Sequence, residues 1–336
     1  MNILGIETSC DETSAAVLRG DFAIASSVVL SQDEIHAPYG GVVPELASRQ
    51  HILSISYVVE ESLRRAELEL RDIDAYSVTQ GPGLIGSLLV GLSYAKALGF
   101  AFRKPVIPVD HLEAHVYSAF LENRRIRFPV LALLVSGGHT SLLWMERELR
   151  YEPIGHTRDD AAGEALDKIA KFLGLGYPGG PIIDKLAADG DPRTFRLAPP
   201  QMSDGSPDFS FSGFKTAALR QIREWNLTRG HPGIQDFLAG FESSVVRALL
   251  HNVDRAVRER SPESLILCGG VARNRRLRRE FEAYGRNAGI PAYIPSPEFC
   301  TDNAAMVAGL ALARRESGET SASELTLNAY ARRSRG

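Results

Sequence analysis

The hydrophobic and polar positions of the first 127 residues alternate with two different periods. Runs rich in β-branched and aliphatic residues, separated by turn-forming residues, predict strands at 3–7, 14–19, 23–30, 73–79 and 106–109. Apolar positions with helical spacing predict helices over 44–65 and 84–102. A strand, a helix and a strand in this order imply a parallel pair of strands with a right-handed crossover. The pattern therefore predicts an α/β fold.

The second half opens like the first, with an apolar strand, a turn of small polar residues and another apolar strand. The elements predicted here span 130–135, 140–145, 160–173, 265–268, 274–287, 292–294 and 301–316. Two similar openings suggest duplicated α/β lobes that face each other. We expect the first lobe to span 1–127, completed by 301–336, and the second to span 128–300. The tail after Gly318 is expected to be surface-bound or frayed.

Three strand ends run into tight turns of small residues, at 6–13, 135–140 and 268–274. Such turns present bare backbone N–H groups to which an anion can come close. One turn of this kind would be weak support for a binding site, because glycine pairs also make ordinary hairpins. Three of them indicate a cleft built around a ligand that carries phosphate.

Composition narrows the class of protein. The chain has 336 residues, of which 44% are hydrophobic and 24% charged, and its net charge is −3. This charge provides no general attraction to nucleic acid, so any RNA contact must come from local patches or from a partner. Three cysteines without C-x-x-C spacing favour a reducing cytosol, and we expect a cytoplasmic protein without a leader peptide. Polar residues interrupt 84–102, which favours a buried helix over a membrane span.

His111 and His115 lie four residues apart in a helix predicted over 111–122, so their imidazoles share one face. This pair can hold a metal ion just after a strand end, where ligand sites of α/β proteins gather. A third ligand is expected from another strand end, and we choose Asp302. Two imidazoles and one carboxylate suit iron(II) or zinc. From the spacing alone, two ordinary surface histidines are an equally good interpretation.

Carboxylates and glycines in the first two turns offer further candidates. Asp11 and Glu12 can orient a metal-bound water or accept a proton from an attacking amine, although Asp is also common in plain hairpin turns. Ser136, Gly137 and Gly138 allow the backbone to approach a phosphate or an oxyanion, and they also suit a simple hairpin.

The second half contains three more candidates for ligand contact. Asp167, on the predicted helix after 160, can hold ribose hydroxyls or be an ordinary solvated charge. The glycine–proline turn that contains Gly180 and leads to Asp184 is rigid enough to shape a specific backbone path. Asn274 offers both a donor and an acceptor beside glycines that leave room for a flat ring. The arginines that follow it are either a phosphate-binding patch or a solvated face.

Together these motifs resemble one family over nearly the whole chain, the bacterial-type tRNA N6-adenosine threonylcarbamoyltransferases, once mislabelled O-sialoglycoprotein endopeptidases. The resemblance is carried by 5–13, 36–45, 110–115, 135–140, 159–168, 177–181, 209–215, 268–274 and 301–305. It implies the actin-like fold of sugar kinases and heat-shock ATPases, with two lobes around a nucleotide cleft. Leu166 stands where the family more often has Phe, which affects local packing alone.

The resemblance also implies roles for individual residues. His111, His115 and Asp302 would hold one iron(II), or alternatively zinc, with Asp11 and Glu12 nearby as catalytic carboxylates. The adenylate substrate would contact Leu134, Val135, Ser136, Gly137, Gly138, Asp167, Gly180, Asp184 and Asn274. The reaction would transfer threonylcarbamoyl from threonylcarbamoyl-AMP to N6 of the adenosine beside the anticodon in tRNAs that read ANN codons, and would release AMP.

The implied partners are tRNA, a shorter paralogous actin-like protein, a P-loop ATPase and a separate synthase that makes the adenylate. Rival functions are a small-molecule kinase of the same superfamily, which would not need the histidine pair, and a non-catalytic scaffold. A metallopeptidase is disfavoured because Glu113 lies midway between His111 and His115 instead of beside either one.

Overall fold

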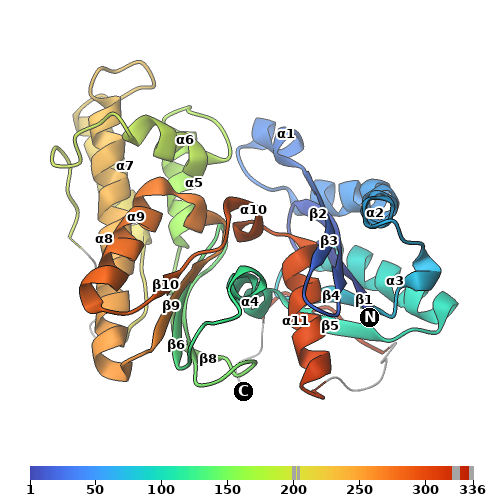
Figure 1. The fold of residues 1–336 in the computed structure, drawn as a ribbon. Helices are drawn as coiled ribbons and strands as arrows, with labels where there is room; N and C mark the ends of the chain where they lie inside the picture. The colour runs from blue at the N-terminus through green and yellow to red at the C-terminus, as the bar shows by residue number, and fades with distance from the viewer. Residues whose placement is uncertain (199–201, 203–204, 320–325, 333–336) are drawn as a thin grey trace. The chain divides into compact units, whose positions relative to one another are not determined.

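The computed structural model describes residues 1–198, 202, 205–319 and 326–332 (Figure 1). The chain forms two compact units. Unit 1 contains Met1–Arg124 and Thr301–Gly336, and unit 2 contains Arg125–Cys300. Each unit is built on its own five-stranded mixed sheet.

The sheet of unit 1 has the strand order β3-β2-β1-β4-β5. Its strands are β1 (Asn2–Glu7), β2 (Glu12–Arg19), β3 (Ile24–Ser31), β4 (Ala75–Gly81) and β5 (Val106–Asp110). The first three form an antiparallel meander, whereas β4 pairs in parallel with both β1 and β5. The parallel pair β4–β5, joined through a helix, is the β-α-β unit that the sequence predicts.

Helices cover both faces of this sheet. The helices of unit 1 are α1 (Asp33–His36), α2 (Pro44–Ala66), α3 (Ile85–Phe102), α4 (His111–Glu122) and α11 (Ala304–Glu316), and all except the short α1 contact strands of the sheet. Because side chains of β1 alternate between faces, Leu4 and Ile6 pack with residues of α2 and α3. Gly5 points to the opposite face, where α11 comes so close that a Cβ on Gly5 would lie 2.4 Å from the Ala304 carbonyl oxygen. The C-terminal helix therefore completes the first unit.

Unit 2 repeats the arrangement with the strand order β10-β9-β6-β7-β8. The strands are β6 (Val130–Val135), β7 (Thr140–Met145), β8 (Glu152–His156), β9 (Ser264–Cys268) and β10 (Ala292–Tyr293). Its helices are α5 (Ala162–Phe172), α6 (Gly179–Ala187), α7 (Ser212–Glu224), α8 (Ile234–Arg260), α9 (Arg275–Ala288) and α10 (Pro297–Cys300). β6, β7 and β8 are antiparallel, and β9 is parallel to β6 and β10. One large core contains β6, α5 and α8.

The α/β fold class predicted from the sequence is confirmed. The predicted helix over 84–102 is present as α3, but it is less buried than expected. α3 is long and apolar enough to cross a membrane by length and composition, and 33% of it is buried. One face packs on the sheet through residues such as Leu88 and Leu92, and the other leaves Leu89 and Phe100 exposed.

Part of the tail after Gly318 is bound to unit 1. Leu327 and Ala329 pack against its core, and the Tyr330 N–H donates to the Gln80 carbonyl at 3.2 Å. The rest of that tail, 320–325 and 333–336, lies outside the described residues.

Candidate functional site

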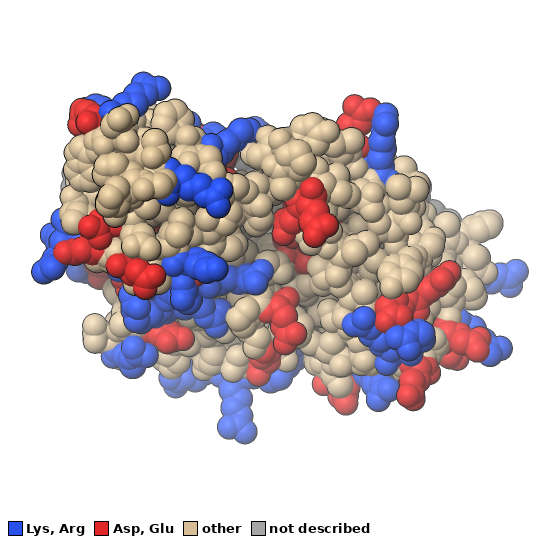
Figure 2. Space-filling view, turned by 90° about the horizontal axis from the view of Figure 1, so that it is seen from above, with Lys and Arg blue, Asp and Glu red and all other residues tan. Residues whose placement is uncertain are grey.

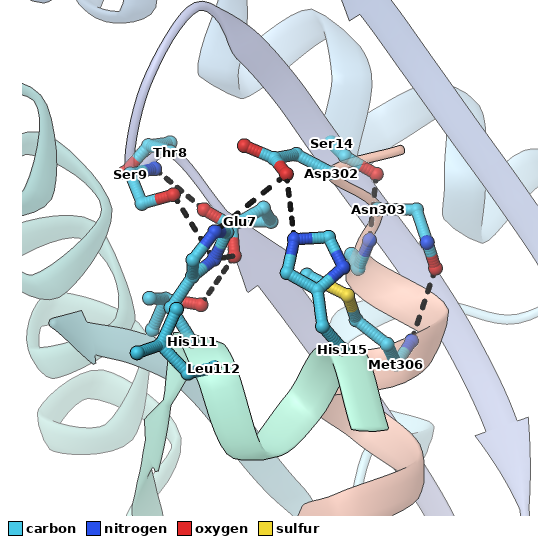
Figure 3. A network of polar contacts seen from close by, with 12 residues as sticks. Glu7, Thr8, Ser9, Ser14, His111, Leu112, His115, Asp302, Asn303 and Met306 are labelled. Carbon is cyan, nitrogen blue, oxygen red and sulfur yellow. Dashed lines mark hydrogen bonds and ion pairs between the residues drawn. The ribbon is translucent and has the colours of Figure 1, made fainter. Parts of the chain in front are cut away.

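Two histidines and an aspartate converge at one point of unit 1 (Figure 3). The Asp110 carboxylate caps α4 by accepting from the Leu112 and Glu113 N–H groups at 2.9 and 3.1 Å, so the helix starts directly at His111. One turn later comes His115. Their Nε2 atoms lie 3.6 and 2.9 Å from Asp302 Oδ1. Asp302 immediately precedes Asn303, the N-cap residue of α11.

A buried carboxylate contacts Nδ1 of His111, the ring nitrogen that does not face Asp302. Glu7, at the end of β1, places Oε2 3.2 Å from His111 Nδ1, and the Ser9 hydroxyl lies 3.1 Å from the same nitrogen. Glu7 itself accepts from the Thr79 hydroxyl and the Ser9 N–H, each at 2.5 Å. A carboxylate on the second ring nitrogen is the usual support of a metal-binding histidine. It directs Nε2 of His111 toward Asp302.

The three side chains fit a transition metal ion. Their ligand atoms lie within 4.8 Å of one another, and both histidines are buried. His115 Nδ1 is buried and has no hydrogen-bond partner among the described residues, so Nε2, beside Asp302, is the nitrogen directed into the site. Two imidazoles and one carboxylate are a donor set that iron(II) and zinc accept. The structure thus brings together the three ligands predicted from the sequence.

The triad of His111, His115 and Asp302 lies beside the carboxylate of Glu7, so the charges of these groups influence one another. Burial lowers the pKa of His111, but the carboxylates of Asp302 and Glu7 outweigh it and raise the pKa to about 9. Burial raises the pKa of Glu7, yet the neighbouring His111 brings the pKa below its ordinary value. Without a metal ion, the site therefore keeps a proton on His111. A bound cation would take the place of that positive charge.

Asp11 and Glu12 lie at the turn from β1 into β2, and Asp11 is buried. Burial, followed by the negative charges of Asp302 and Asp11, raises the pKa of Glu12 well above its ordinary value. Burial also raises the pKa of Asp11, with Asp302 adding to the effect. Burial is the largest cause of both pKa shifts, and the negative charge of Asp302 adds to each. Raised pKa values favour the protonated form of both carboxyls relative to exposed acids, and groups that can exchange a proton are what acid–base chemistry requires.

In unit 2, two of the predicted turns lie side by side. Leu134 pairs with Cys268 near the ends of the parallel strands β6 and β9, so the turns that follow open at the same sheet edge. The Ser136 N–H donates to the His139 carbonyl at 2.8 Å, which closes the first turn. A Cβ on Gly137, Gly138 or Gly270 would meet nothing within 4 Å. Open backbone at a strand end can admit a phosphate.

The remaining four predicted residues of unit 2 are engaged in polar contacts at the starts of helices. Asp167 Oδ1 accepts from the Gly179 and Gly180 N–H groups at 2.8 and 3.3 Å, which ties α5 to the start of α6. Asp184 accepts from the Arg275 N–H at 3.0 Å and also binds its guanidinium. The arginine-rich start of α9 is therefore partly neutralised. Arg275, one of the arginines expected either to bind phosphate or to form a solvated face, is paired with Asp184 and is exposed to solvent.

The side chain of Asn274 is fixed by Glu242, a residue that was not predicted from the sequence. Its Nδ2 donates to Glu242 Oε1 at 2.6 Å, while its Oδ1 accepts from the Leu277 N–H at 2.9 Å. Glu242 is buried in the long helix α8 and also pairs with Arg276 at 2.9 Å. Glu7 was missed in the same way. Both are single acids within apolar runs, and an acid in a buried run was the available signal.

Comparison with known proteins places these features in a family. Residues 23–309 match the family model of tRNA N6-adenosine threonylcarbamoyltransferase. A tRNA N6-adenosine threonylcarbamoyltransferase from Geotalea uraniireducens is 49% identical, over 92% of this chain and 90% of its own. One from Syntrophomonas wolfei is 48% identical over 98% and 96%.

Solved structures share the fold at low identity. Component A of the Acidaminococcus fermentans (R)-2-hydroxyglutaryl-CoA dehydratase is 17% identical, with a TM-score of 0.58 over 95% of this chain and 100% of that one. Full-length HypF in its phosphate- and nucleotide-bound form is 16% identical, with a TM-score of 0.61 over 96% and 56%. These similarities concern the fold alone, and they agree with the actin-like fold class predicted from the sequence.

Proposed function

The chain belongs to the tRNA N6-adenosine threonylcarbamoyltransferase family, and we propose that it transfers threonylcarbamoyl from threonylcarbamoyl-AMP to N6 of an adenosine in tRNA. The protein is thus an enzyme, an acyltransferase that acts on tRNA. In tRNAs that read ANN codons, the target is the adenosine beside the anticodon. Unit 1 and unit 2 serve as the two actin-like lobes.

The observation that carries the proposal is the convergence of His111, His115 and Asp302 in a member of this family. These residues would hold one iron(II) per subunit, with zinc as the alternative. When bound, the ion would polarise oxygens of the adenylate and stabilise negative charge on them. Glu7 orients the His111 ring for this role through its contact with Nδ1.

In unit 2, we assign adenylate binding to the adjoining turns and helix starts. The backbone of Leu134, Val135 and the Ser136–Gly138 turn would bind the phosphate. Asp167, Gly180 and Asp184 would line the ribose, and Asn274 would face the adenine. Since Glu242 already holds Asn274 Nδ2, one N–H of that amide and a lone pair of its oxygen are left to read the base.

The chemical step exchanges one bond to the carbamoyl carbon for another. The N6 amine of the adenosine attacks this carbon, a C–N bond forms, and the C–O bond to the phosphate of AMP breaks. The amine must lose a proton. Asp11 is proposed to accept it, with Glu12 beside it sharing the proton, since burial raises the pKa of both acids and so strengthens them as proton acceptors.

The same family membership suggests partners, and unit 1 has a surface suited to one of them. α2 and α3 pack together and leave large apolar side chains in solvent: Ile52, Leu53, Tyr57, Ile85, Leu89 and Phe100. Large apolar side chains exposed on one pair of packed helices commonly mark an interface. We assign it to the shorter paralogous actin-like protein. A P-loop ATPase and a separate synthase of the adenylate would complete the system, in the cytoplasm.

Reconstitution tests this function directly. The protein is incubated with the proposed partners, threonine, bicarbonate, ATP and unmodified tRNA, and the digested nucleosides are analysed for threonylcarbamoyladenosine. Formation of this nucleoside together with AMP is expected, and it should stop when the chain is omitted. ATP consumption with phosphorylation of a small acceptor, and no modified nucleoside, would instead support the kinase alternative.

A further inference from the structure

The described end of the tail, 326–332, runs along unit 1 and is held at several points. Gln80 Nε2 donates to the Asn328 carbonyl at 2.7 Å, and the Gly83 N–H donates to the Ala331 carbonyl at 3.4 Å. Lys96 also donates to the Leu327 carbonyl. These contacts place the tail beside the end of β4 and the start of α3. A segment without regular secondary structure is thereby fixed in position.

Tyr330 projects from this tail onto the start of the metal-binding helix. Its ring lies over Gly81, where an added Cβ would come within 2.7 Å of ring carbon Cδ2. Its hydroxyl donates to Asp110 Oδ2 at 2.7 Å. The other oxygen of Asp110 caps α4 at the Leu112 and Glu113 N–H groups. One carboxylate therefore joins the tail to the first turn of α4.

This contact lies on the side of α4 away from the metal ligands. Glu113, two residues after His111 and therefore on another face of the helix, pairs with Arg314 of α11. Arg314 also donates to the Pro108 carbonyl at 3.1 Å. A cavity of about 390 Å³ lies here, and its lining includes Asp110, Glu113, Arg314 and Tyr330. Polar contacts of Asp110, Glu113 and Arg314 thus border the cavity beside α4.

We propose that Tyr330 is a positioning residue for the metal site: its hydroxyl fixes the Asp110 carboxylate, which fixes the start of α4 and with it the imidazole of His111. The link is short, since His111 directly follows Asp110 and is the first residue of the helix. A displaced Asp110 would release the Leu112 and Glu113 N–H groups and let the first turn fray. The proposal rests on the proposed metal-binding role of the triad.

The test compares Tyr330→Phe with the native protein in two measurements. In the metal-free protein, hydrogen exchange at the Leu112 and Glu113 amides should become about tenfold faster, the factor expected from the loss of one hydrogen bond. In a competition with a chromophoric chelator, the dissociation constant for Zn²⁺ should rise about tenfold, as for other supports of metal ligands. Exchange in α8 of unit 2 should not change.

Two variants separate positioning from general stability. Tyr330→Ala also removes the ring and should increase both effects. Tyr293→Phe removes a hydroxyl from β10 in unit 2 and should change neither. If Tyr330→Phe leaves exchange at the two amides and Zn²⁺ affinity unchanged, the inference is overturned while the metal site stands.

The two proposals can fail separately. If the native protein binds no Zn²⁺ or Fe²⁺, the proposed metal-binding role of His111, His115 and Asp302 is wrong. The exchange measurement then still decides whether Tyr330 fixes the first turn of α4: faster exchange at Leu112 and Glu113 in Tyr330→Phe supports this step of the inference, and unchanged exchange rejects it.

Discussion

Units 1 and 2 contain the same sheet with different chemistry at its edge. In each, a three-stranded antiparallel meander continues into two parallel strands, and the first strand of the meander is central. Around the end of β1 in unit 1 lie Glu7, Asp11 and Glu12, with two histidines beside them. After β6 in unit 2 come Ser136, Gly137 and Gly138.

The difference shows how one backbone plan can present two kinds of chemistry at a strand end. Acidic side chains at the end of β1, with imidazoles from α4, create a negative site that favours a cation. Bare glycine backbone at the corresponding place leaves N–H groups that favour an anion. The outer surfaces of the units differ as well. Large apolar side chains lie exposed on α2 and α3 of unit 1, whereas Phe172 and Trp225 are the exposed large apolar residues among the described part of unit 2.

Removal of both imidazoles from unit 1 should have the largest effect. In His111→Ala/His115→Ala we expect the metal to be lost and transfer to fall by at least about 1000-fold, since a metal supplies several kcal/mol of charge stabilisation. Metal content by mass spectrometry and single-turnover transfer rates measure this. His251→Ala, an exposed histidine on α8, is the control. Transfer at the native rate by the double variant without metal would refute the role of the triad.

A displacement of the Ser136–Gly138 turn in unit 2 should weaken use of the adenylate and leave the metal site of unit 1 unchanged. A Cβ on Gly163 would lie 2.5 Å from the Ser136 carbonyl oxygen, so Gly163→Ala must displace the turn. We expect kcat/KM for the adenylate to fall about 10- to 100-fold through misplacement of the substrate, with unchanged metal content. Gly213→Ala, where a Cβ meets nothing within 4 Å, should have native kinetics. Equal kinetics for Gly163→Ala and Gly213→Ala would show that the position of the Ser136–Gly138 turn does not affect substrate binding.

Metal binding at the acidic site of unit 1 should depend on pH, unlike phosphate binding at the uncharged Ser136–Gly138 turn of unit 2. The pKa of His111 is raised from 6.5 to about 9, so its proton stabilises the metal-free fold below pH 6.5, and this stabilisation disappears as the pH rises through 9. Because metal must displace that proton, its apparent affinity should rise about tenfold per pH unit between these values. Calorimetric titrations at several pH values would show this. A flat profile would contradict it.

A substitution among the exposed apolar side chains of α2 and α3 should weaken association with the partner and leave the transfer reaction itself unchanged. Leu53 on α2 is 76% exposed, so Leu53→Glu should not unfold the protein. We expect it to weaken binding of the paralogous partner by about tenfold or more, the loss typical of one interface anchor, with native metal content. Phe172→Glu in unit 2 is the matched control. Sedimentation of the mixed proteins gives the affinity, and equal binding by both variants would place the interface elsewhere.

Much of the framework was predictable from local pattern. The strands over 130–135 and 140–145 and the helix over 111–122 occur with the predicted bounds, because alternation and the Asp110 cap are local signals. By contrast, β8, α7 and α8 were not predicted from the sequence. α8 combines a wide apolar face with buried polar residues such as Glu242 and Asn252, which obscures its helical period.

The candidate site divides in the same way. His111 and His115 could be paired from their spacing, since residues four apart share a helix face. Glu7 and Tyr330 could not be assigned to the site from any local pattern, because their partners lie 104 and 220 residues away in the chain. Asn274 was noted for its donor and acceptor, but its fixed orientation depends on Glu242, 32 residues before it.

The sequence by itself determined the two repeated strand–turn–strand openings, the histidine pair and the family, because these depend on residue type and short spacing. Tertiary structure alone decided which buried carboxylate contacts His111 or Asn274 and which stretch of tail contacts the start of α4. The physical reason is that a buried charge must find its partner in space, and the folded chain brings such partners together from any distance along the sequence.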